Sequence, residues 1–211
     1  MIYIDVHTHS AATSPDTVKI VDGGQETGLF SAGLHPWHLS AETLNDSLAA
    51  LEKKLRIPSC IALGEAGLDK ICDTAWPLQI EAFTRQLKLA ERYQKPLIIH
   101  CVRATQEVLE LKKGSCVPWI FHGFRSSAES AESLVKKGFY LSFGAALPDC
   151  EKTRSAFNAI PVEKIFLETD ESPVCIKDIY SEAAKLKGIT EEELCGVVKK
   201  NFINVFGDIL K

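Results

Sequence analysis

Short apolar runs alternate with longer amphipathic segments along most of the chain. The runs are rich in β-branched and aromatic residues, whereas the segments between them repeat apolar positions every three to four residues. This alternation is typical of an α/β fold, in which helices connect the strands of a parallel sheet. The apolar runs cover residues 2–6, 30–34, 60–63, 96–99, 118–121, 139–143 and 165–167.

Two of the connecting segments carry a clear helical stripe. One stripe consists of Leu44, Leu48, Leu51 and Leu55, and the other consists of Ile80, Phe83, Leu87 and Ala90. Pro77 lies just before the second stripe, as expected for the first turn of a helix. Near the end of the chain, Thr190 and Glu193 have the spacing of a capping box, so we expect a helix to begin there.

The first third of the chain departs from this regular alternation. Residues 17–21 are predicted to form a further strand, but segments 11–16 and 22–29 are shorter than the dozen or so residues that a parallel crossover needs. We therefore expect this part of the sheet to be irregular or incomplete. The connection that we expect to be most mobile is residues 147–152.

Composition and charge narrow the class of protein. The 211 residues, 45% of them hydrophobic, lack repeats and linker-like tracts, and we predict a single domain over residues 1–211. Neither a signal peptide nor a run of about 18 apolar residues is apparent, and the seven cysteines lack a CxxC pair, so we expect a cytoplasmic protein with reduced thiols. A net charge of −4 argues against an extended nucleic-acid surface.

Two histidines follow the first apolar run, in the sequence Asp5-Val6-His7-Thr8-His9. Side chains two residues apart in a strand lie on one face, so His7 and His9 can bind one metal ion together. Asp5 shares that face and can orient the imidazoles from behind. The alternative is that both histidines are surface or hydrogen-bonded residues.

Four further apolar runs are each followed by a side chain of a metal-ligand type, namely Glu65, His100, His122 and Asp170. Catalytic groups of β/α barrels come from the carboxyl ends of different strands and converge on one mouth, so this recurrence favours a barrel. Together with the first histidine pair, the set exceeds what one tetrahedral zinc ion requires. It predicts two divalent ions (Zn, Mg or Mn) about 3.5–4 Å apart, with Glu65 as the candidate bridge.

In combination, these motifs resemble those of the TatD-type metal-dependent deoxyribonucleases of the amidohydrolase superfamily. The resemblance runs from end to end and rests on Asp5-Val6-His7-Thr8-His9, Gly33-Leu34-His35-Pro36-Trp37, Gly64-Glu65-Ala66-Gly67-Leu68-Asp69, Pro96-Leu97-Ile98-Ile99-His100, His122-Gly123-Phe124, Glu168-Thr169-Asp170 and Asn201-Phe202. It implies a TIM-type (β/α) barrel and metal-dependent hydrolysis. It also implies that His7, His9, Glu65 and Asp170 serve one ion, and that Glu65, His100 and His122 serve the other.

A rival phosphoesterase family, the polymerase-and-histidinol-phosphatase type, shares the opening pattern from Asp5 to Ser10. The later His122-Gly123-Phe124 and Thr169-Asp170 favour the TatD type. The chain is shorter than is usual for that family, with a helix missing after His9 and a substrate-side loop missing after residue 173.

The residues that would contact substrate are less regular. The family usually has an arginine two residues after the third histidine, where this chain has Val102 followed by Arg103. Arg103 and Arg125 are the available replacements, because a guanidinium suits a phosphodiester. His35 is a further candidate for substrate contact, and Trp37 beside it offers a face for stacking. His38 is expected to be structural, and Asp69 either orients the Glu65 loop or caps a turn.

The predicted reaction is hydrolysis by a water that two cations have made more acidic, with Asp170 and Glu65 as catalytic residues. The resemblance favours a DNA end or small phosphodiester as substrate and a monomer or small homo-oligomer as the assembly. An amide, ester or lactone hydrolase on the same barrel is the alternative, since fold does not fix substrate. A non-catalytic metal-binding scaffold is disfavoured, because unused buried polar groups are costly.

Overall fold

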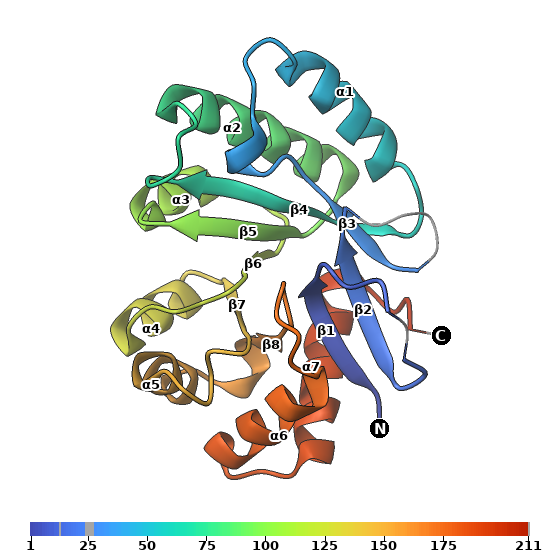
Figure 1. Ribbon diagram of the computed structural model, residues 1–211, viewed down its shortest axis with the longest axis vertical. Coiled ribbons are helices and arrows are strands. Elements are labelled where there is room, and N and C mark those ends of the chain that lie inside the picture. The colour runs from blue at the N-terminus through green and yellow to red at the C-terminus, as the bar shows by residue number, and fades with distance from the viewer. Residues whose placement is uncertain (13, 24–27, 211) are drawn as a thin grey trace. The chain divides into compact units, whose positions relative to one another are not determined.

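The computed structural model describes residues 1–12, 14–23 and 28–210, and the chain forms two compact units. Unit 1 consists of Met1–Val21 and Ile120–Lys211, and unit 2 consists of Asp22–Trp119. Both units alternate parallel strands with helices, as the hydrophobic pattern predicts (Figure 1). The single-domain organisation stays a prediction. No described helix is long and apolar enough to cross a membrane.

Unit 2 is built on a parallel sheet of three strands, β3 (Phe30–Ala32), β4 (Cys60–Asp69) and β5 (Leu97–Val102). Its helices are η1 (Pro36–His38), α1 (Leu44–Leu55), α2 (Trp76–Tyr93) and α3 (Thr105–Lys112). Helices α1 and α2 both pack on β4 (Figure 1). The four leucines predicted to form the stripe of α1 are all buried, so this prediction is confirmed.

The buried face of α2 differs from the predicted stripe. Phe83 and Ala90 are fully buried as expected, but Ile80 and Leu87 are only half-buried. Two polar residues, Gln79 and Gln86, take the central places, each with 1% of its surface exposed. The stripe was therefore placed about one residue away from the face that packs on the sheet.

Each of these glutamines forms paired hydrogen bonds with the backbone of one residue. Gln86 accepts from Leu34 N–H (2.7 Å) and donates to Leu34 O (3.1 Å). Gln79 accepts from Asp69 N–H (2.8 Å) and donates to Asp69 O (2.9 Å). A buried peptide group needs a partner for both its N–H and its C=O, and here a side-chain amide supplies both. Helix α2 thereby fixes the backbone next to His35 and at Asp69.

Strand β4 is longer than predicted and approaches β5 very closely. It continues six residues beyond the predicted end at residue 63, with irregular register against β5 between Leu63 and Ala66. Glu65 therefore lies within the strand, and the prediction that it follows the strand end is wrong. At Gly67, an added Cβ would lie 1.9 Å from His100 O, so no larger residue fits between the two strands.

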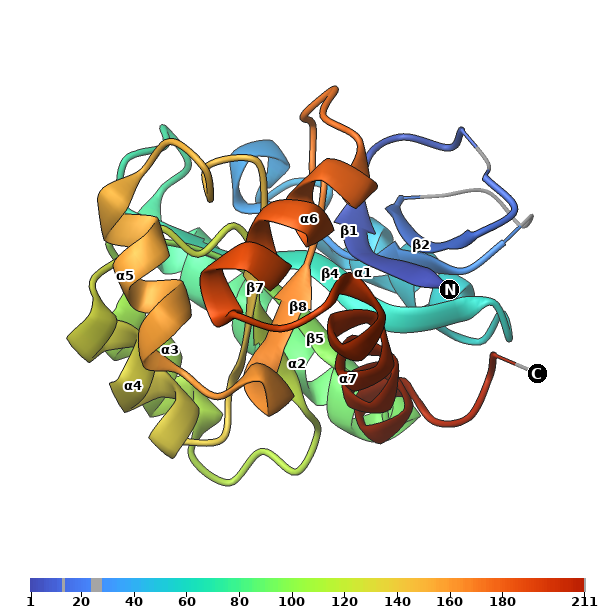
Figure 2. The ribbon, with the colours of Figure 1, turned by 90° about the horizontal axis from the view of Figure 1, so that it is seen from below.

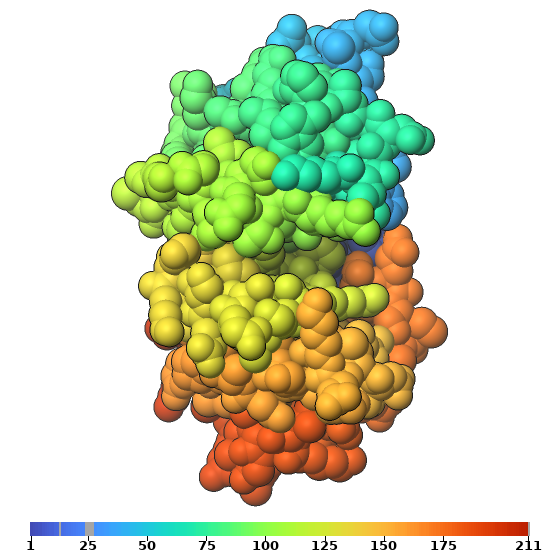
Figure 3. Space-filling model, turned by 90° about the vertical axis from the view of Figure 1, so that its left-hand side faces the viewer, coloured from blue at the N-terminus to red at the C-terminus, as the bar shows by residue number. Residues whose placement is uncertain are grey.

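Unit 1 contains β1 (Tyr3–Thr8), β2 (Thr17–Asp22), which belongs to it up to Val21, and the parallel series β6 (Trp119–Phe121), β7 (Tyr140–Phe143) and β8 (Ile165–Leu167). Its helices are α4 (Ala128–Lys136), α5 (Glu151–Ala159), η2 (Val162–Lys164), α6 (Ile176–Lys187) and α7 (Glu191–Phe206). Helices α4 and α5 lie side by side on the surface (Figure 3), whereas α6 and α7 pack on β1 and β8 (Figure 2).

Strands β1 and β2 are parallel although no helix connects them in the described residues of 9–16. This short connection is the irregularity predicted for the first third of the chain. Helix α6 holds β1 in place through Tyr180, whose hydroxyl donates to Ile4 O (3.0 Å) and accepts from Ile4 N–H (3.1 Å). The predicted capping box is confirmed at α7, where Thr190 and Glu193 bond each other's backbone. Helix α5 already begins at Glu151, so the end of the predicted loop 147–152 is helical.

We expect Gly67→Ala to lower the free energy of unfolding by about 2 kcal/mol or more, because the added methyl group would force β4 and β5 apart. Gly196→Ala is the matched control. Gly196 is exposed in α7 with open space around its Cβ position, so the same substitution should raise the free energy of unfolding by about 0.5–1 kcal/mol. Denaturant titration measures both. Equal effects of the two substitutions would contradict the close approach of the strands.

Candidate metal centre

In unit 1, the histidine pair of β1 faces Asp170. The Nε2 atoms of His7 and His9 lie 3.6 and 3.5 Å from Asp170 Oδ1. The His7 side chain is buried, whereas 39% of the His9 side chain and 36% of the Asp170 side chain are exposed. Two imidazole nitrogens and a carboxylate oxygen thus lie close together, and the carboxylate of Asp170 is partly exposed to solvent.

Asp170 has an unusual backbone conformation that β1 holds in place. Its φ is +53°, in the left-handed region that side-chain-bearing residues rarely adopt. Asp170 N–H donates to His7 O (3.0 Å), and His9 N–H donates to Asp170 O (3.2 Å). These two bonds flank the histidine pair, so the same backbone contacts fix the two imidazoles and the carboxylate relative to one another.

Asp5 supports this arrangement by binding Thr169, the residue directly before Asp170. Its carboxylate accepts hydrogen bonds from Thr169 N–H (2.9 Å) and Thr169 Oγ1 (2.7 Å). Burial raises the pKa of Asp5 to about 6, although the two bonds from Thr169 act in the opposite direction. The sequence predicted that Asp5 orients the histidines, and its hydrogen bonds place it against the Asp170 segment instead.

A second group of possible ligands in unit 1 consists of His122, Glu168 and Asp170. Glu168 is buried, and its Oε1 accepts from Gly123 N–H (2.6 Å) and lies 3.4 Å from His122 Nδ1. The rings of His7 and His122 lie 4.5 Å apart, so His122 joins the histidine pair. Glu168 belongs to the motif Glu168-Thr169-Asp170, but it was not among the predicted site residues. Its position two residues before Asp170 was the available signal, because that spacing places both on one face of an extended chain.

In unit 2, His35, Glu65 and His100 form a group of possible ligands. Glu65 Oε1 lies 2.7 Å from His100 Nδ1 and 3.1 Å from His35 Nε2, and the two imidazole nitrogens are 3.3 Å apart. All three side chains are largely buried. His35, predicted as a substrate contact, therefore also has a position from which it could bind metal.

The ligands of unit 2 are held by residues whose roles the sequence left open or did not show. Asp69 Oδ2 accepts from Trp37 Nε1 (2.7 Å) and lies 3.1 Å from His100 Nε2, which leaves His100 Nδ1 directed at Glu65. Burial acts to raise the pKa of Asp69, but the hydrogen bonds from Trp37, Ile71 N–H and His100 outweigh it and hold that pKa below its usual value.

Asp22 has a similar role for Glu65. Its Oδ1 accepts from Glu65 N–H (2.7 Å) and from Ser31 Oγ (3.1 Å). The hydrophobic pattern could not reveal this contact, because Asp22 and Glu65 are far apart in the sequence and Asp22 belongs to a segment predicted as a connection. The structure places it at the end of β2.

The predicted arginines lie in different surroundings. Arg125 borders a hollow of unit 1 that Asp170 and Glu168 also line. Arg103 is exposed directly after β5, with a left-handed φ of +53°. His38 is exposed in η1, as expected, and 56% of the Trp37 surface is exposed although its N–H is bonded.

The donor set of unit 1 fits a divalent ion. Two ligands that lie about 2.1 Å from a tetrahedral ion are separated by about 3.4 Å, close to the 3.5 and 3.6 Å measured between Asp170 Oδ1 and the histidine nitrogens. Zinc binds both imidazole nitrogen and carboxylate oxygen, and carboxylate oxygen also suits manganese and magnesium.

Residues 2–207 match the sequence model of the family described as TatD related DNase. The chain belongs to this family. Its relatives include the uncharacterized metal-dependent hydrolase YcfH of Escherichia coli (strain K12), with 28% identity over 217 residues, 93% of this chain and 81% of YcfH. They also include the 3'-5' ssDNA/RNA exonuclease TatD of Edwardsiella piscicida, with 31% identity over 160 residues, 71% of this chain and 60% of that protein.

Among solved structures, that of YJJV, a TatD homolog from Escherichia coli k12, is similar with a TM-score of 0.83 at 22% identity, covering 98% of both chains. This likeness confirms the predicted fold, the TIM-type β/α barrel. Family membership confirms the resemblance seen in the sequence, and this TatD family member is a metal-dependent hydrolase that acts on ester bonds. The individual metal ligands stay a prediction.

We expect Asp69→Ala to weaken the binding of Zn²⁺ or Mn²⁺ about 10-fold or more, because His100 loses the acceptor that orients its ring. Trp37→Phe, which removes one donor to Asp69, should have a smaller effect in the same direction. Glu107→Ala is the control, since Glu107 pairs with Lys70 in the same unit without contacting a histidine in any hydrogen bond described. Calorimetric titration of the metal-free protein measures the affinity. An unchanged affinity in folded Asp69→Ala protein would contradict the role given to Asp69.

Proposed function

We propose that the chain is a divalent-metal-dependent phosphodiesterase that acts on DNA ends or small nucleotides. The observation that carries the proposal is the carboxylate of Asp170, which lies within reach of two imidazoles and is still partly open to solvent. A group in this position can contact both a metal ion and the reacting ester. The name of the relative from Edwardsiella piscicida, an exonuclease of single-stranded DNA and RNA, supports a phosphodiester as the substrate.

The proposed metal ligands are the six predicted from the sequence, and the proposed count is two divalent ions. His7, His9, His122 and Asp170 contribute from unit 1, and Glu65 and His100 contribute from unit 2. A divalent ion supplies a Lewis acid that makes water more acidic and withdraws charge from the ester.

Asp170 is the proposed proton acceptor. As the water oxygen forms a bond to phosphorus, Asp170 takes up the proton that the water releases. When the P–O bond to the leaving group breaks, Asp170 returns that proton to the leaving oxygen, and the products are a phosphate monoester and an alcohol. The partial exposure of its side chain allows the carboxylate to reach both oxygens.

Substrate contacts are proposed for His35, Arg103 and Arg125. Arg125 has the clearest support, because it borders a hollow that also includes Asp170. A guanidinium can donate two parallel hydrogen bonds to a phosphate, which orients the ester as well as attracting it. His35 accepts from Trp37 N–H through Nδ1, so its N–H is on Nε2, which lies 3.1 Å from Glu65 Oε1, and this is the group that would donate to a phosphate oxygen.

We expect Glu65→Gln to abolish hydrolysis of bis(p-nitrophenyl) phosphate and to weaken metal binding, since the neutral amide loses the charge that attracts the cation. His38→Ala should leave turnover within about a few-fold of the starting value, because His38 is exposed at the end of η1. Steady-state rates with added Mn²⁺, Mg²⁺ or Zn²⁺, and after removal of metal by a chelator, provide the comparison. Equal losses in both variants would show that the site is misplaced.

The same assay distinguishes the proposed function from its alternative. A phosphodiesterase should hydrolyse bis(p-nitrophenyl) phosphate much faster than a carboxylic ester such as p-nitrophenyl acetate. Metal-dependent activity on the acetate alone would contradict the proposal and favour a carboxylic ester, amide or lactone hydrolase.

Polymeric DNA should be a poor substrate, because the chain carries a net negative charge of −4 and has Val102 at the position where the family usually has an arginine. The logarithm of DNA affinity falls with the logarithm of salt at about 0.9 per phosphate contact, so one or two contacts give a shallow slope. We expect kcat/KM for a short oligonucleotide to change little between low and moderate salt, with cleavage at strand ends. Faster cleavage of closed circular DNA than of a dinucleotide, with a slope of several units, would refute this expectation.

A further inference from the structure

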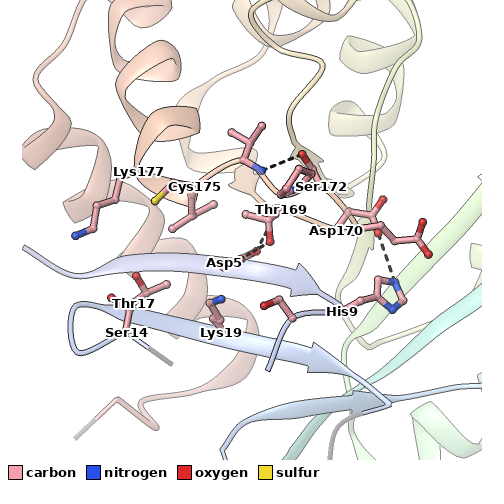
Figure 4. Close-up of a pocket in the computed structure, with 15 residues that line it drawn as sticks. Asp5, His9, Ser14, Thr17, Lys19, Thr169, Asp170, Ser172, Cys175 and Lys177 are labelled. Carbon is pink, nitrogen blue, oxygen red and sulfur yellow. Dashed lines mark hydrogen bonds and ion pairs between the residues drawn. The ribbon is translucent and has the colours of Figure 1, made fainter. Parts of the chain in front are cut away.

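A hollow of about 590 Å³ lies in unit 1 next to His9 and Asp170. One side is formed by the β1–β2 connection and β2, and the other by residues 169–177 (Figure 4). Its volume is within the roughly 300–1,000 Å³ of sites that bind small organic molecules. The hollow is next to the short β1–β2 connection, where the described residues form no helix.

The two sides of the hollow differ in chemistry. Pro173, Val174 and Ile176 form an apolar wall at the start of α6, and 39% of the Val174 surface is exposed. Opposite this wall, β2 contributes Thr17 and Lys19 (Figure 4). Such a combination suits a molecule with an apolar ring or sugar on one side and an anionic group on the other.

Lys19 is the important residue, because in the described part of the chain its ammonium group is held by no hydrogen bond, although it interacts electrostatically with the buried carboxylate of Asp5 on the neighbouring strand. Its half-buried side chain forms no hydrogen bond or ion pair with any residue in the described ranges 1–12, 14–23 and 28–210. The other ammonium group of the hollow, that of Lys177, is paired with Asp16. Asp5 lies beside Lys19 in the register of the two strands, but both of its oxygens accept hydrogen bonds from Thr169.

We infer that this hollow binds the nucleotide unit next to the scissile ester and that Lys19 binds a second phosphate on that unit. The inference rests on the proposed function and adds the substrate class, a small phosphodiester or strand end that carries a terminal phosphate. The apolar wall covers the base or sugar, Asp170 at one end of the hollow adjoins the scissile ester, and Lys19 selects for the additional negative charge.

The test compares dinucleotides with and without a terminal phosphate, placed at the 5′ end in one pair and at the 3′ end in the other. For one of the two ends, kcat/KM should be about tenfold higher with the phosphate, mainly through a lower KM, as expected for one charge-assisted hydrogen bond. Lys19→Met should remove this preference and leave the rate on bis(p-nitrophenyl) phosphate unchanged. Lys19→Arg should retain the preference.

Lys185→Met is the matched control, because Lys185 is an exposed residue of α6 in the same unit. It should keep the preference. A binding measurement is independent of turnover: thymidine 3′,5′-bisphosphate should inhibit the wild-type protein about tenfold more strongly than Lys19→Met protein. No preference in the wild type, or a preference that survives in Lys19→Met, would overturn the inference alone. Absence of any phosphodiester hydrolysis with any divalent metal would overturn the proposed function and this inference with it.

Discussion

The backbone bridge between Asp170 and β1 is the contact on which the unit 1 site depends. Asp170 adopts a left-handed conformation, which costs a residue with a side chain on the order of 1–3 kcal/mol. Two backbone hydrogen bonds to β1 and two bonds from Thr169 to Asp5 oppose this cost, each contributing about 0.5–1.5 kcal/mol or more where a carboxylate accepts. The strained backbone of Asp170 is therefore stable only while β1 is in place, and β1 also carries His7 and ends directly before His9.

In unit 2, side-chain amides hold the backbone that positions the possible ligands. Gln79 and Gln86 lie on the buried face of α2, and each satisfies both polar groups of one peptide, at Asp69 and at Leu34. A hydrophobic residue at either place would fill the space but would leave a buried N–H and C=O without partners, at a cost of about 1–3 kcal/mol for each group. The polar positions of α2 thus belong to the support of the site, because Asp69 in turn orients His100.

The sequence predicted which possible metal ligands lie close together better than it predicted the contacts that hold them. In unit 1, His7 and His9 form a group of possible ligands with Asp170, and in unit 2 Glu65 and His100 form one with His35. The supporting contacts of Asp22 and Glu168 were missed and the role of Asp69 was left open, because these contacts join segments distant in sequence. Hydrophobic periodicity does not indicate which polar atoms contact each other. The burial of the two glutamines of α2 was not predicted for a related reason, since a polar residue beside a helical apolar stripe usually faces solvent.

The extent of β4 shows a further limit. A run of apolar residues marks the part of a strand that is buried, but Gly64, Glu65 and Gly67 interrupt the run without ending the strand. Glycine is used here for its size, since only a residue without a Cβ allows β4 to pass so close to the backbone of β5. The close approach of β4 to β5 at Gly67 determines where His100 lies relative to Glu65. Gly67 interrupts the apolar pattern, yet it allows the two possible ligands to lie close together.

Chemistry and specificity have different origins in this chain. Imidazoles and carboxylates near strand ends can support hydrolysis of many esters, so they do not by themselves select a substrate. Selection must come from groups beside them whose charge is not already balanced. In the hollow beside His9 and Asp170, Asp5 accepts from Thr169 and Lys177 pairs with Asp16, so Lys19 can respond to a substrate there, while Arg125 borders the neighbouring hollow. Because the short β1–β2 connection adjoins the hollow that Lys19 lines, the irregular first third of the barrel is where substrate preference can differ from that of longer family members.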